Sequence, residues 1–273
     1  MTDDRVETVP GATPDEAGDD HAADWQARVV KRSLRTATKR SIDRGSALVR
    51  AAARLLERSN GDMFTVQDVA DEAGQSLRTL YQYFESKDDL LLAVFEEAMR
   101  TYARMIGNAI VDLADPLERL GGGVLAAVRM PEFSGTGVDR GLARLRLTLA
   151  EVEPALVARS QQPVTVLVRD LVAEAAEAGA VRTADPDAAT YMILALKSAF
   201  ITGETLGNDS GVRLPGVFAL TSFCLAGLGA SVDDTWLEAV NGRLHLPDRI
   251  TTLGPPSTPA RRGRASRSPS APA

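Results

Sequence analysis

Arg78 and Gln82 lie four residues apart in the segment SLRTLYQYF, residues 76–84, so on a helix they share one face. Arginine can bind O6 and N7 of guanine, and glutamine can bind N6 and N7 of adenine, through paired hydrogen bonds in the major groove of DNA. Neighbouring side chains carry hydroxyls that suit phosphates or a methyl that suits thymine: Thr79, Tyr81 and Tyr83. The apolar residues fall on the opposite face: Leu77, Leu80 and Phe84. The pattern predicts a helix that packs inward with one face and binds DNA with the other.

The residues on either side make this helix the second one of a helix-turn-helix motif. Thr65 and Asp68 form a predicted capping box that starts the preceding helix, and Gly74 is expected to end it. Ser76 is the predicted N-cap of the short helix, and Ser86 caps the next. An ordinary helical hairpin with a solvated outer face would have the same turn, but two tyrosines exposed on a short helix are unexpected there. We therefore expect the DNA-binding form of the motif.

The charge of the chain is distributed unevenly. Its formal net charge is −6, yet residues 28–58 are strongly basic and follow an acidic segment, residues 1–24. A basic block beside a helix-turn-helix motif favours a polyanionic partner over a merely solvated surface. We expect residues 1–40 to form a disordered acidic leader and basic arm, with residues 28–40 contacting DNA beside the motif. The Pro/Ser/Arg-rich tail, residues 249–273, is expected to be disordered.

Helical patterns follow one another along the chain, and no segment alternates as a strand should, so we expect an all-α fold. The predicted helices begin or end at caps, prolines and glycines: 41–58, 65–74, 76–84, one that begins at 86, 116–130, 141–149, 154–178 with a kink at Pro163, 186–206 and 214–231. The glycine-rich stretch 120–127 falls inside one of them, where we expect a site of close packing or a hinge.

The run LPGVFALTSFCLAGLGASV, residues 214–232, carries no charge. It is nearly long enough to cross a bilayer, but Pro215, glycines and hydroxyl side chains dilute its hydrophobicity. A helix that is apolar on all sides is buried in a core or between subunits, so we expect an interface helix with Leu225 and Leu228 facing outward. Nothing near the N-terminus resembles a signal peptide, and we expect a cytoplasmic protein associated with the nucleoid.

The residues needed for enzymatic chemistry are scarce. There are two histidines, His21 and His245, and no nucleophile elbow, zinc-protease, phosphate-loop or dinucleotide-binding pattern. The single cysteine, Cys224, excludes an internal disulfide. It lies in the apolar run without a basic neighbour and is expected to be an inert core residue. We expect no catalytic residue, no metal site and no cofactor.

Residues 44–100 resemble the N-terminal domain of TetR-family (tetracycline-repressor-like) transcriptional regulators. The similarity lies in ALVRAAARLL and in FTVQDVADEAGQSLRTLYQYFESKDDLLLAVF, where the Leu-Tyr-x-x-Phe-x-x-Lys run at residues 80–87 is the most specific part. The resemblance implies a DNA-binding domain at residues 41–103, with the helix-turn-helix at residues 65–84. It also implies a larger helical effector-binding and dimerisation domain at residues 104–248.

In the family the recognition helix corresponds to residues 76–84, and the starts of the preceding and following helices hold phosphates. The resemblance therefore implies a set of DNA contacts: Thr65, Gln75, Ser76, Leu77, Arg78, Thr79, Tyr81, Gln82, Tyr83 and Lys87. Gln75 stands where the family has a small apolar residue, and we expect it to reach the DNA backbone instead. Free amides at a helix N-terminus bind anions, which agrees with phosphate contacts by Thr65 and Lys87.

The resemblance further implies a homodimer held by helices 186–206 and 214–231, which binds a near-palindromic operator in double-stranded DNA. It implies a repressor that a small, largely apolar organic effector releases from DNA, with the helix that begins at residue 86 as the mechanical link. Side chains of the middle helices are the candidate effector contacts: Arg146, Tyr191 and Met192, together with Glu153, Gln161 and Lys197. Two alternatives remain, a constitutive DNA-binding dimer and a helical adaptor that uses residues 76–84 for a protein partner.

Overall fold

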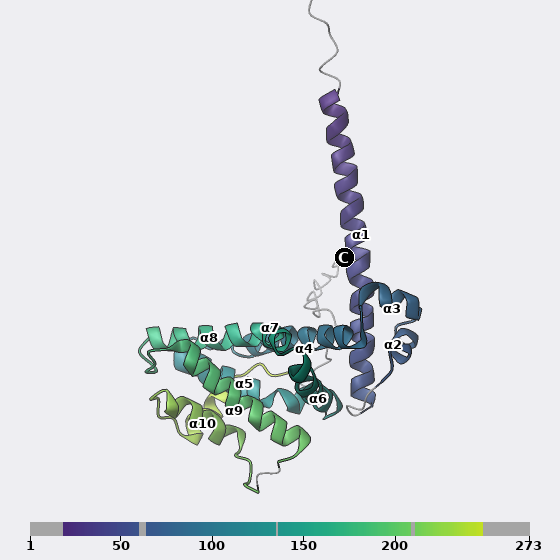
Figure 1. The fold of residues 1–273 in the computed structure, drawn as a ribbon. Helices are drawn as coiled ribbons and strands as arrows, with labels where there is room; N and C mark the ends of the chain where they lie inside the picture. Colours follow the sequence, from purple (N-terminus) through teal and green to yellow (C-terminus); the bar gives the residue numbers. More distant parts are fainter. Residues whose placement is uncertain (1–18, 60–63, 135, 209–210, 248–273) are drawn as a thin grey trace, which may run out of the picture. The chain divides into compact units, whose positions relative to one another are not determined.

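The computed structural model describes residues 19–59, 64–134, 136–208 and 211–247, and every regular element in these ranges is an α-helix (Figure 1). The helices are α1 Asp19–Arg58, α2 Val66–Glu72, α3 Leu77–Tyr83, α4 Lys87–Ala109, α5 Pro116–Ser134, α6 Thr136–Val152, α7 Pro154–Ser160, α8 Gln162–Glu177, α9 Pro186–Leu206, α10 Val217–Gly227 and α11 Asp234–Gly242. The predicted all-α fold is confirmed. The chain forms two compact units, residues 1–46 and 47–273, and α1 contributes residues to both.

α1 begins earlier than the sequence predicts. The sequence predicts an unstructured arm that ends at residue 40, whereas residues 28–40 belong to a helix that begins at Asp19. The chain has neither proline nor glycine between Asp19 and residue 44, and alanine, arginine and lysine, which are good helix formers, are frequent there. The apolar stripe begins only near Leu48, so a search for amphipathic periodicity misses the first half of the helix. The predicted disordered tail and the first 18 residues of the predicted leader lie outside the described residues.

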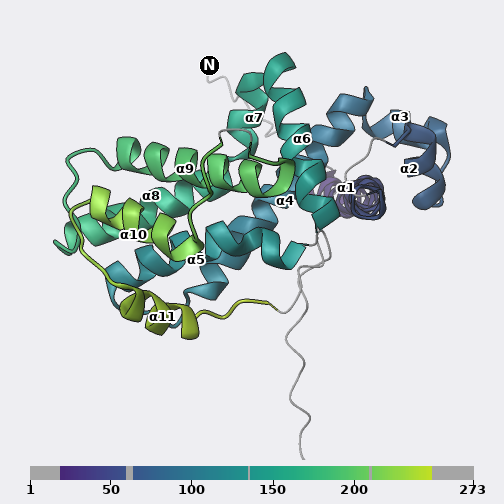
Figure 2. The same ribbon diagram turned by 90° about the horizontal axis from the view of Figure 1, so that it is seen from below.

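The helices of the predicted DNA-binding domain share one core. Leu48 of α1, Val69 of α2, Leu80 of α3 and Leu90 of α4 are all fully buried. They belong to a hydrophobic cluster that continues through the rest of the second unit. α4 carries this cluster onward because it packs against α5, α6, α7 and α8 (Figure 2). One helix therefore belongs both to the helix-turn-helix region and to the helical domain that follows.

Three consecutive glycines let other elements approach α5 closely. A Cβ atom added to Gly121, Gly122 or Gly123 would meet a different neighbour in each case: Trp236 Cη2 at 2.8 Å, Leu113 Cδ1 at 2.8 Å and Leu171 Cδ1 at 2.6 Å, respectively. Two non-bonded carbon atoms prefer about 3.5–4.0 Å, so none of these positions has room for a side chain. Of the two roles predicted for residues 120–127, close packing is the one that the structure bears out.

The middle helices differ from the prediction in their bounds. The sequence predicts one kinked helix over residues 154–178, whereas the structure has two, α7 and α8, with Gln161 between them. Pro163 lies in the first turn of α8, where a missing backbone N–H is tolerated, so it begins a helix instead of bending one. α11 was not foreseen, although Asp233 caps it by accepting a 2.8 Å hydrogen bond from the Trp236 amide.

α10 covers 11 residues of the predicted helix 214–231. The prediction that Leu225 and Leu228 face outward is wrong, because both are buried within their own unit. The exposed side chain is Phe223, at 66%. A helix that is apolar on every side has no periodic signal to say which side faces inward, and this explains the error. Among the described residues, no helix combines the length and apolar character that a membrane span requires.

Candidate functional site

α2 begins with the capping box that the sequence predicts. Thr65 Oγ1 accepts a 3.1 Å hydrogen bond from the Asp68 amide, and the Thr65 amide donates a 2.8 Å bond to Asp68 Oδ2. Hydrogen bonds from the hydroxyl and then the amide of Thr65 to the carboxylate lower the pKa of Asp68. The cap fixes the first turn of α2 while Thr65 itself stays exposed.

A left-handed glycine makes the turn between α2 and α3. Gly74 has a φ of 63°. Its amide donates to the Asp71 carbonyl at 3.1 Å, and the Gln75 amide donates to the Ala70 carbonyl at 2.9 Å. These two bonds form a Schellman motif, which ends a helix and needs a residue with positive φ. Ser76 then caps α3, since its Oγ accepts a 3.0 Å bond from the Thr79 amide, so both predicted caps are confirmed.

The outer face of α3 presents Arg78, Tyr81 and Gln82 to solvent, with Tyr81 exposed to 50%. The inner face is the predicted one, because Leu80 is fully buried and Leu77 is half-buried. The other predicted contacts at this helix are less accessible or already bonded. Tyr83 is half-buried against the core, and the Thr79 hydroxyl shares a 2.8 Å hydrogen bond with the hydroxyl of Ser76, the N-cap. Three side chains are thus free to reach into a groove from this helix.

The other predicted DNA contacts lie at the ends of the neighbouring helices. Thr65 precedes α2, Gln75 is half-buried in the turn, and Lys87 is half-buried in the first turn of α4. Ser86 caps α4 as predicted, because its Oγ accepts a 3.1 Å bond from the Asp89 amide. The two helix starts therefore have defined geometry on either side of α3.

Two arginines of the predicted basic block hold α2 against α1. Arg54 Nε lies 2.7 Å from Glu72 Oε1, and Arg58 donates to the other oxygen of the same carboxylate. The hydrogen bonds from Arg58 and then Arg54 lower the pKa of Glu72. Part of the basic block therefore stabilises the motif itself.

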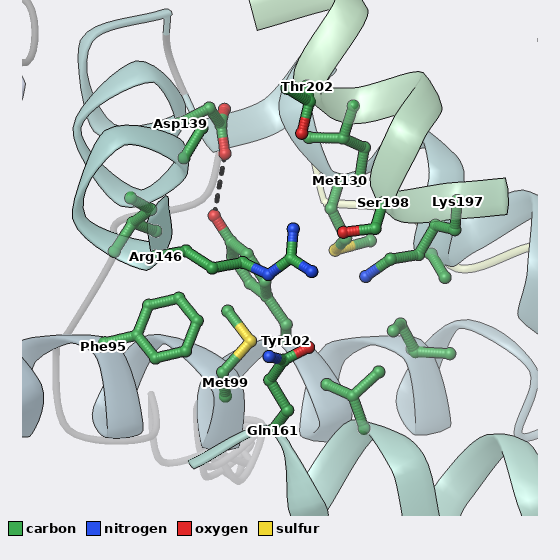
Figure 3. Close-up of a pocket in the computed structure, with 16 residues that line it drawn as sticks. Phe95, Met99, Tyr102, Met130, Asp139, Arg146, Gln161, Lys197, Ser198 and Thr202 are labelled. Carbon is green, nitrogen blue, oxygen red and sulfur yellow. Dashed lines mark hydrogen bonds between the residues drawn. The ribbon is translucent and has the colours of Figure 1, made fainter. Parts of the chain in front are cut away.

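A cavity of about 70 Å³ lies among α4, α5, α6, α8 and α9 (Figure 3). Its apolar lining includes Phe95, Met99, Ile106, Met130, Leu142, Val164 and Ile201. Its polar lining consists of Tyr102, Asp139, Arg146, Gln161, Lys197, Ser198 and Thr202. α4 provides part of the wall, so the helix that carries Lys87 at one end also carries cavity residues further along.

Two cations and one carboxylate are present among the described residues that line the cavity. The Tyr102 hydroxyl donates a 2.9 Å hydrogen bond to Asp139 Oδ1, and Asp139 is buried. Arg146 of α6 and Lys197 of α9 extend into the space, and their charged ends point toward one another (Figure 3). Burial, and next the Arg146 charge, lower the pKa of Lys197 to about 8. Within the described ranges, neither Arg146 nor Lys197 forms an ion pair.

The structure brings together half of the predicted effector contacts. Arg146, Gln161 and Lys197 line the cavity. Tyr191 and Met192 do not, since they are 75% and 56% exposed on the surface of α9. On a helix they lie more than about 100° away from the position of the cavity-facing lysine. Glu153 is also exposed, at the N-terminus of α7.

The buried polar pair inside this cavity is not predicted by any pattern in the sequence. Tyr102 and Asp139 lie 37 positions apart in the chain, and no local pattern connects them. A tyrosine at an apolar-face position of α4 is the one available signal, because a buried phenol needs a hydrogen-bond partner. Cys224 is buried as expected, and this burial raises the pKa of its thiol to about 11. The described residues contain no group of three His, Cys, Asp or Glu side chains that could hold a metal ion.

Residues 48–94 match a protein family described as bacterial regulatory proteins, tetR family. Among characterised relatives, the HTH-type transcriptional regulator HbdR of Aromatoleum sp. (strain CIB) is 33% identical over 89 residues, which are 33% of this chain and 39% of HbdR. The chain spans less than half of the length of the curated relatives that it matches. The sequence similarity is thus concentrated in the helix-turn-helix region.

Solved structures resemble a larger part of the fold. RolR in complex with resorcinol has a TM-score of 0.55 at 19% sequence identity, over 77% of this chain and 98% of RolR. FadR from Bacillus subtilis in complex with stearoyl-CoA has a TM-score of 0.52 at 19% identity, over 68% of this chain and 98% of FadR. At such identity the likeness is one of fold, and it extends from the helix-turn-helix into the helical domain.

Proposed function

We propose that this chain, which belongs to the tetR family of bacterial regulatory proteins, is a sequence-specific transcriptional regulator that binds an operator in double-stranded DNA. The observation that carries the proposal is the exposed face of α3, where Arg78 and Gln82 stand beside Tyr81 on the second helix of a helix-turn-helix. Arginine and glutamine are suited to guanine and adenine edges in a major groove. The protein then acts on chromosomal DNA in the cytoplasm.

The ends of the neighbouring helices supply the phosphate contacts of this proposal. Thr65 is exposed at the start of α2, and Lys87 and Ser86 lie at the start of α4. Helix N-termini attract anions through their free amides, so a DNA backbone on each side of α3 would be held there. Contacts of this kind fix the position of a protein on DNA, whereas base contacts select the sequence.

The proposed regulator is a homodimer built on α9 and α10. Large apolar side chains that do not pack within the unit support this: Tyr191 and Met192 on α9, and Phe223 on α10. Exposed apolar patches on otherwise polar proteins commonly mark interfaces. A twofold dimer sets two recognition helices about 34–36 Å apart, one turn of DNA or a multiple of it, and so selects a near-palindromic operator.

The proposed regulator is a repressor that a small organic molecule releases from DNA. The cavity supports this, and so does α4, which forms part of its wall through Met99 and Tyr102 and begins at Lys87 beside the motif. A ligand that prefers a shifted α4 would change the spacing of the two recognition helices. Coupling of this kind is typically worth about 1–3 kcal/mol. The organic ligands of RolR and FadR, resorcinol and stearoyl-CoA, support a ligand-binding role for the same fold.

DNA that co-purifies with the full chain can be sequenced to identify the operator, and the affinity of the operator can be measured by fluorescence anisotropy. Arg78→Ala and Gln82→Ala should each weaken operator binding by about 1–3 kcal/mol while leaving binding to random duplexes nearly unchanged. Arg169→Ala is the matched control, because it removes an exposed arginine from α8. Equal losses on operator and random DNA would show that α3 does not read bases, and the absence of any selected fragment would favour a protein-binding adaptor.

The release step is tested with compounds that raise the melting temperature of the protein. A saturating compound of this kind should weaken operator binding, and a saturating operator should weaken binding of the compound by the same factor. Unchanged operator affinity at saturation would identify the chain as a constitutive DNA-binding dimer.

A further inference from the structure

The cavity has an electrostatic imbalance. Two cationic side chains, Arg146 and Lys197, point into it, while Asp139, the one carboxylate among its described lining residues, accepts a hydrogen bond from the Tyr102 hydroxyl (Figure 3). A guanidinium stays protonated in proteins, so Arg146 cannot relieve the repulsion by losing its charge. Buried charges are stable when they are paired, and among the described residues neither cation has an ion-pair partner, so a bound anion would supply the missing charge.

We propose that the ligand of this cavity is an organic acid, whose carboxylate lies between the Arg146 guanidinium and the Lys197 ammonium and whose body lies against the apolar wall. The inference rests on the ligand-binding role proposed above and adds the chemical class of the ligand. Gln161 and Ser198 line the same space and offer hydrogen bonds to carboxylate oxygens. A neutral ligand of the same shape would leave the two cations facing each other.

The apolar wall of the cavity indicates the chemical character of the rest of the ligand. Phe95, Met99 and Val164 line the same cavity as the two cations, so the body of the acid is aromatic or aliphatic. The space of about 70 Å³ is small beside the roughly 300–1,000 Å³ of typical ligand pockets. Methionine side chains rearrange easily, and Met99 and Met130 both line the cavity. A larger acid would therefore enter by moving these two side chains and by drawing Arg146 and Lys197 aside.

Binding of an acid should change the protonation of Lys197, whereas binding of a neutral ligand should not. The pKa of Lys197 is about 8, so the lysine is about half protonated at that pH. Among the described lining residues, the other titratable groups are Arg146, Asp139 and Tyr102. A carboxylate placed between the two cations would raise the pKa of Lys197 again, so binding should take up about half a proton at pH 8 and almost none near about pH 6.

The experiment uses the full-length protein and three acids, benzoate, hexanoate and decanoate, each compared with its primary amide. Binding is measured by titration calorimetry in two buffers of different ionisation enthalpy, and by the shift of the melting temperature. At least one acid should bind roughly tenfold or more tightly than its amide, with proton uptake at pH 8. The preference should disappear in Arg146→Met and in Lys197→Met, and it should persist in Arg169→Met, a substitution of an exposed α8 arginine outside the cavity.

Amides that bind as tightly as their acids would overturn the proposal, and so would a panel in which no acid binds. A preference for acids that survives both cavity substitutions would also overturn it, because the anion would then lie elsewhere. Operator affinity is measured with the same compounds. An acid that binds with the expected preference but leaves operator affinity unchanged would contradict ligand-controlled release while the anion site stands. If only neutral compounds release the protein from DNA, ligand-controlled release would stand and the anion site would be contradicted.

Discussion

Lys87 Nζ donates a 2.5 Å hydrogen bond to the carbonyl oxygen of Phe64, and the same ammonium lies 5.6 Å from the centre of the Phe64 ring. Lys87 belongs to the first turn of α4, and Phe64 precedes α2 by two residues. The contact therefore fastens the helix that leads to the cavity to the start of the helix-turn-helix. A lysine proposed to hold a phosphate has a structural role as well, and the two roles can be separated by experiment.

Lys87→Met keeps most of the apolar stem and removes the ammonium. It should lower the free energy of unfolding by about 1–3 kcal/mol, because a charged hydrogen bond and a cation–π contact are lost. If Lys87 also contacts DNA, the substitution weakens binding to all sequences alike and reduces the salt dependence of affinity. Urea unfolding measures the first effect, and anisotropy at several salt concentrations measures the second. An unchanged salt slope would leave Lys87 with its structural role alone.

Gly122→Ala in α5 should destabilise the fold relative to Gly107→Ala in α4. A Cβ atom at Gly122 would lie 2.8 Å from Leu113 and 3.0 Å from Leu244, whereas the described residues leave open space around Gly107. Both substitutions gain the same helix propensity, so their difference isolates the steric cost, about 1–3 kcal/mol. Urea unfolding of the two variants measures it. Equal stabilities would mean that Leu113 and Leu244 move aside freely.

Lys197→Met should stabilise the protein most at low pH. The folded-state pKa of Lys197, about 8, lies below the ordinary value of 10.5, so the folded state opposes protonation of this group. Wild-type stability therefore rises between pH 8 and pH 10.5, where Lys197 stays protonated only in the unfolded chain. The advantage of the variant should be about 1–3 kcal/mol at neutral pH and should shrink across that window. A constant difference at all pH values would show that lost packing, not charge, is responsible.

Phe223→Arg should disrupt the proposed dimer. Phe223 is 66% exposed on α10, so an arginine there does not disturb the core of its own unit. Val111→Arg is the control, because Val111 is similarly exposed at 64% but lies just after α4. Sedimentation at micromolar concentration should find a dimer for the wild type and the control, and a monomer or aggregate for Phe223→Arg. A monomeric wild type would contradict the dimer outright.

Removal of residues 1–40 should reduce the salt dependence of DNA binding. The basic side chains between residues 28 and 40 are exposed on α1, and each phosphate contact that is lost lowers the salt slope by about one. The core of the second unit begins at Leu48, so the shortened chain should keep its helical circular-dichroism spectrum. A slope equal to that of the full chain would assign the arm no part in binding.

Local chemistry explains which features the sequence could predict. The capping box at Thr65, the glycine turn at Gly74 and the serine caps at Ser76 and Ser86 each depend on side chains within a few residues of one another. Such signals are complete in the sequence. The start of α1 could not be predicted for the opposite reason, since residues 27–44 of that helix are exposed and bury no apolar face.

Features that depend on tertiary packing could be predicted only in part. Arg146 on α6 and Lys197 on α9 are predicted cavity residues because they are polar side chains of the middle helices, and both line the cavity. Tyr191 and Met192, predicted in the same way, also lie on α9 but point to solvent. The mean character of α9 and α10 is apolar, so periodicity does not separate the face that packs within the unit from the face that does not. That choice is made by neighbouring helices far away in the sequence.

Chirality limits which residues can occupy the turn between α2 and α3. Gly74 has a φ of 63°, and among the described residues no atom beyond its chain neighbours would stand within 4 Å of an added Cβ. An L-amino acid would therefore be destabilised there only by its own backbone, since the left-handed conformation brings its Cβ close to the following carbonyl oxygen. A D-amino acid has the mirror-image preference. D-Alanine, introduced by chemical ligation, would fit the same turn and leave the unfolded chain fewer conformations than glycine does. The handedness of one α-carbon sets which residue can join the two helices.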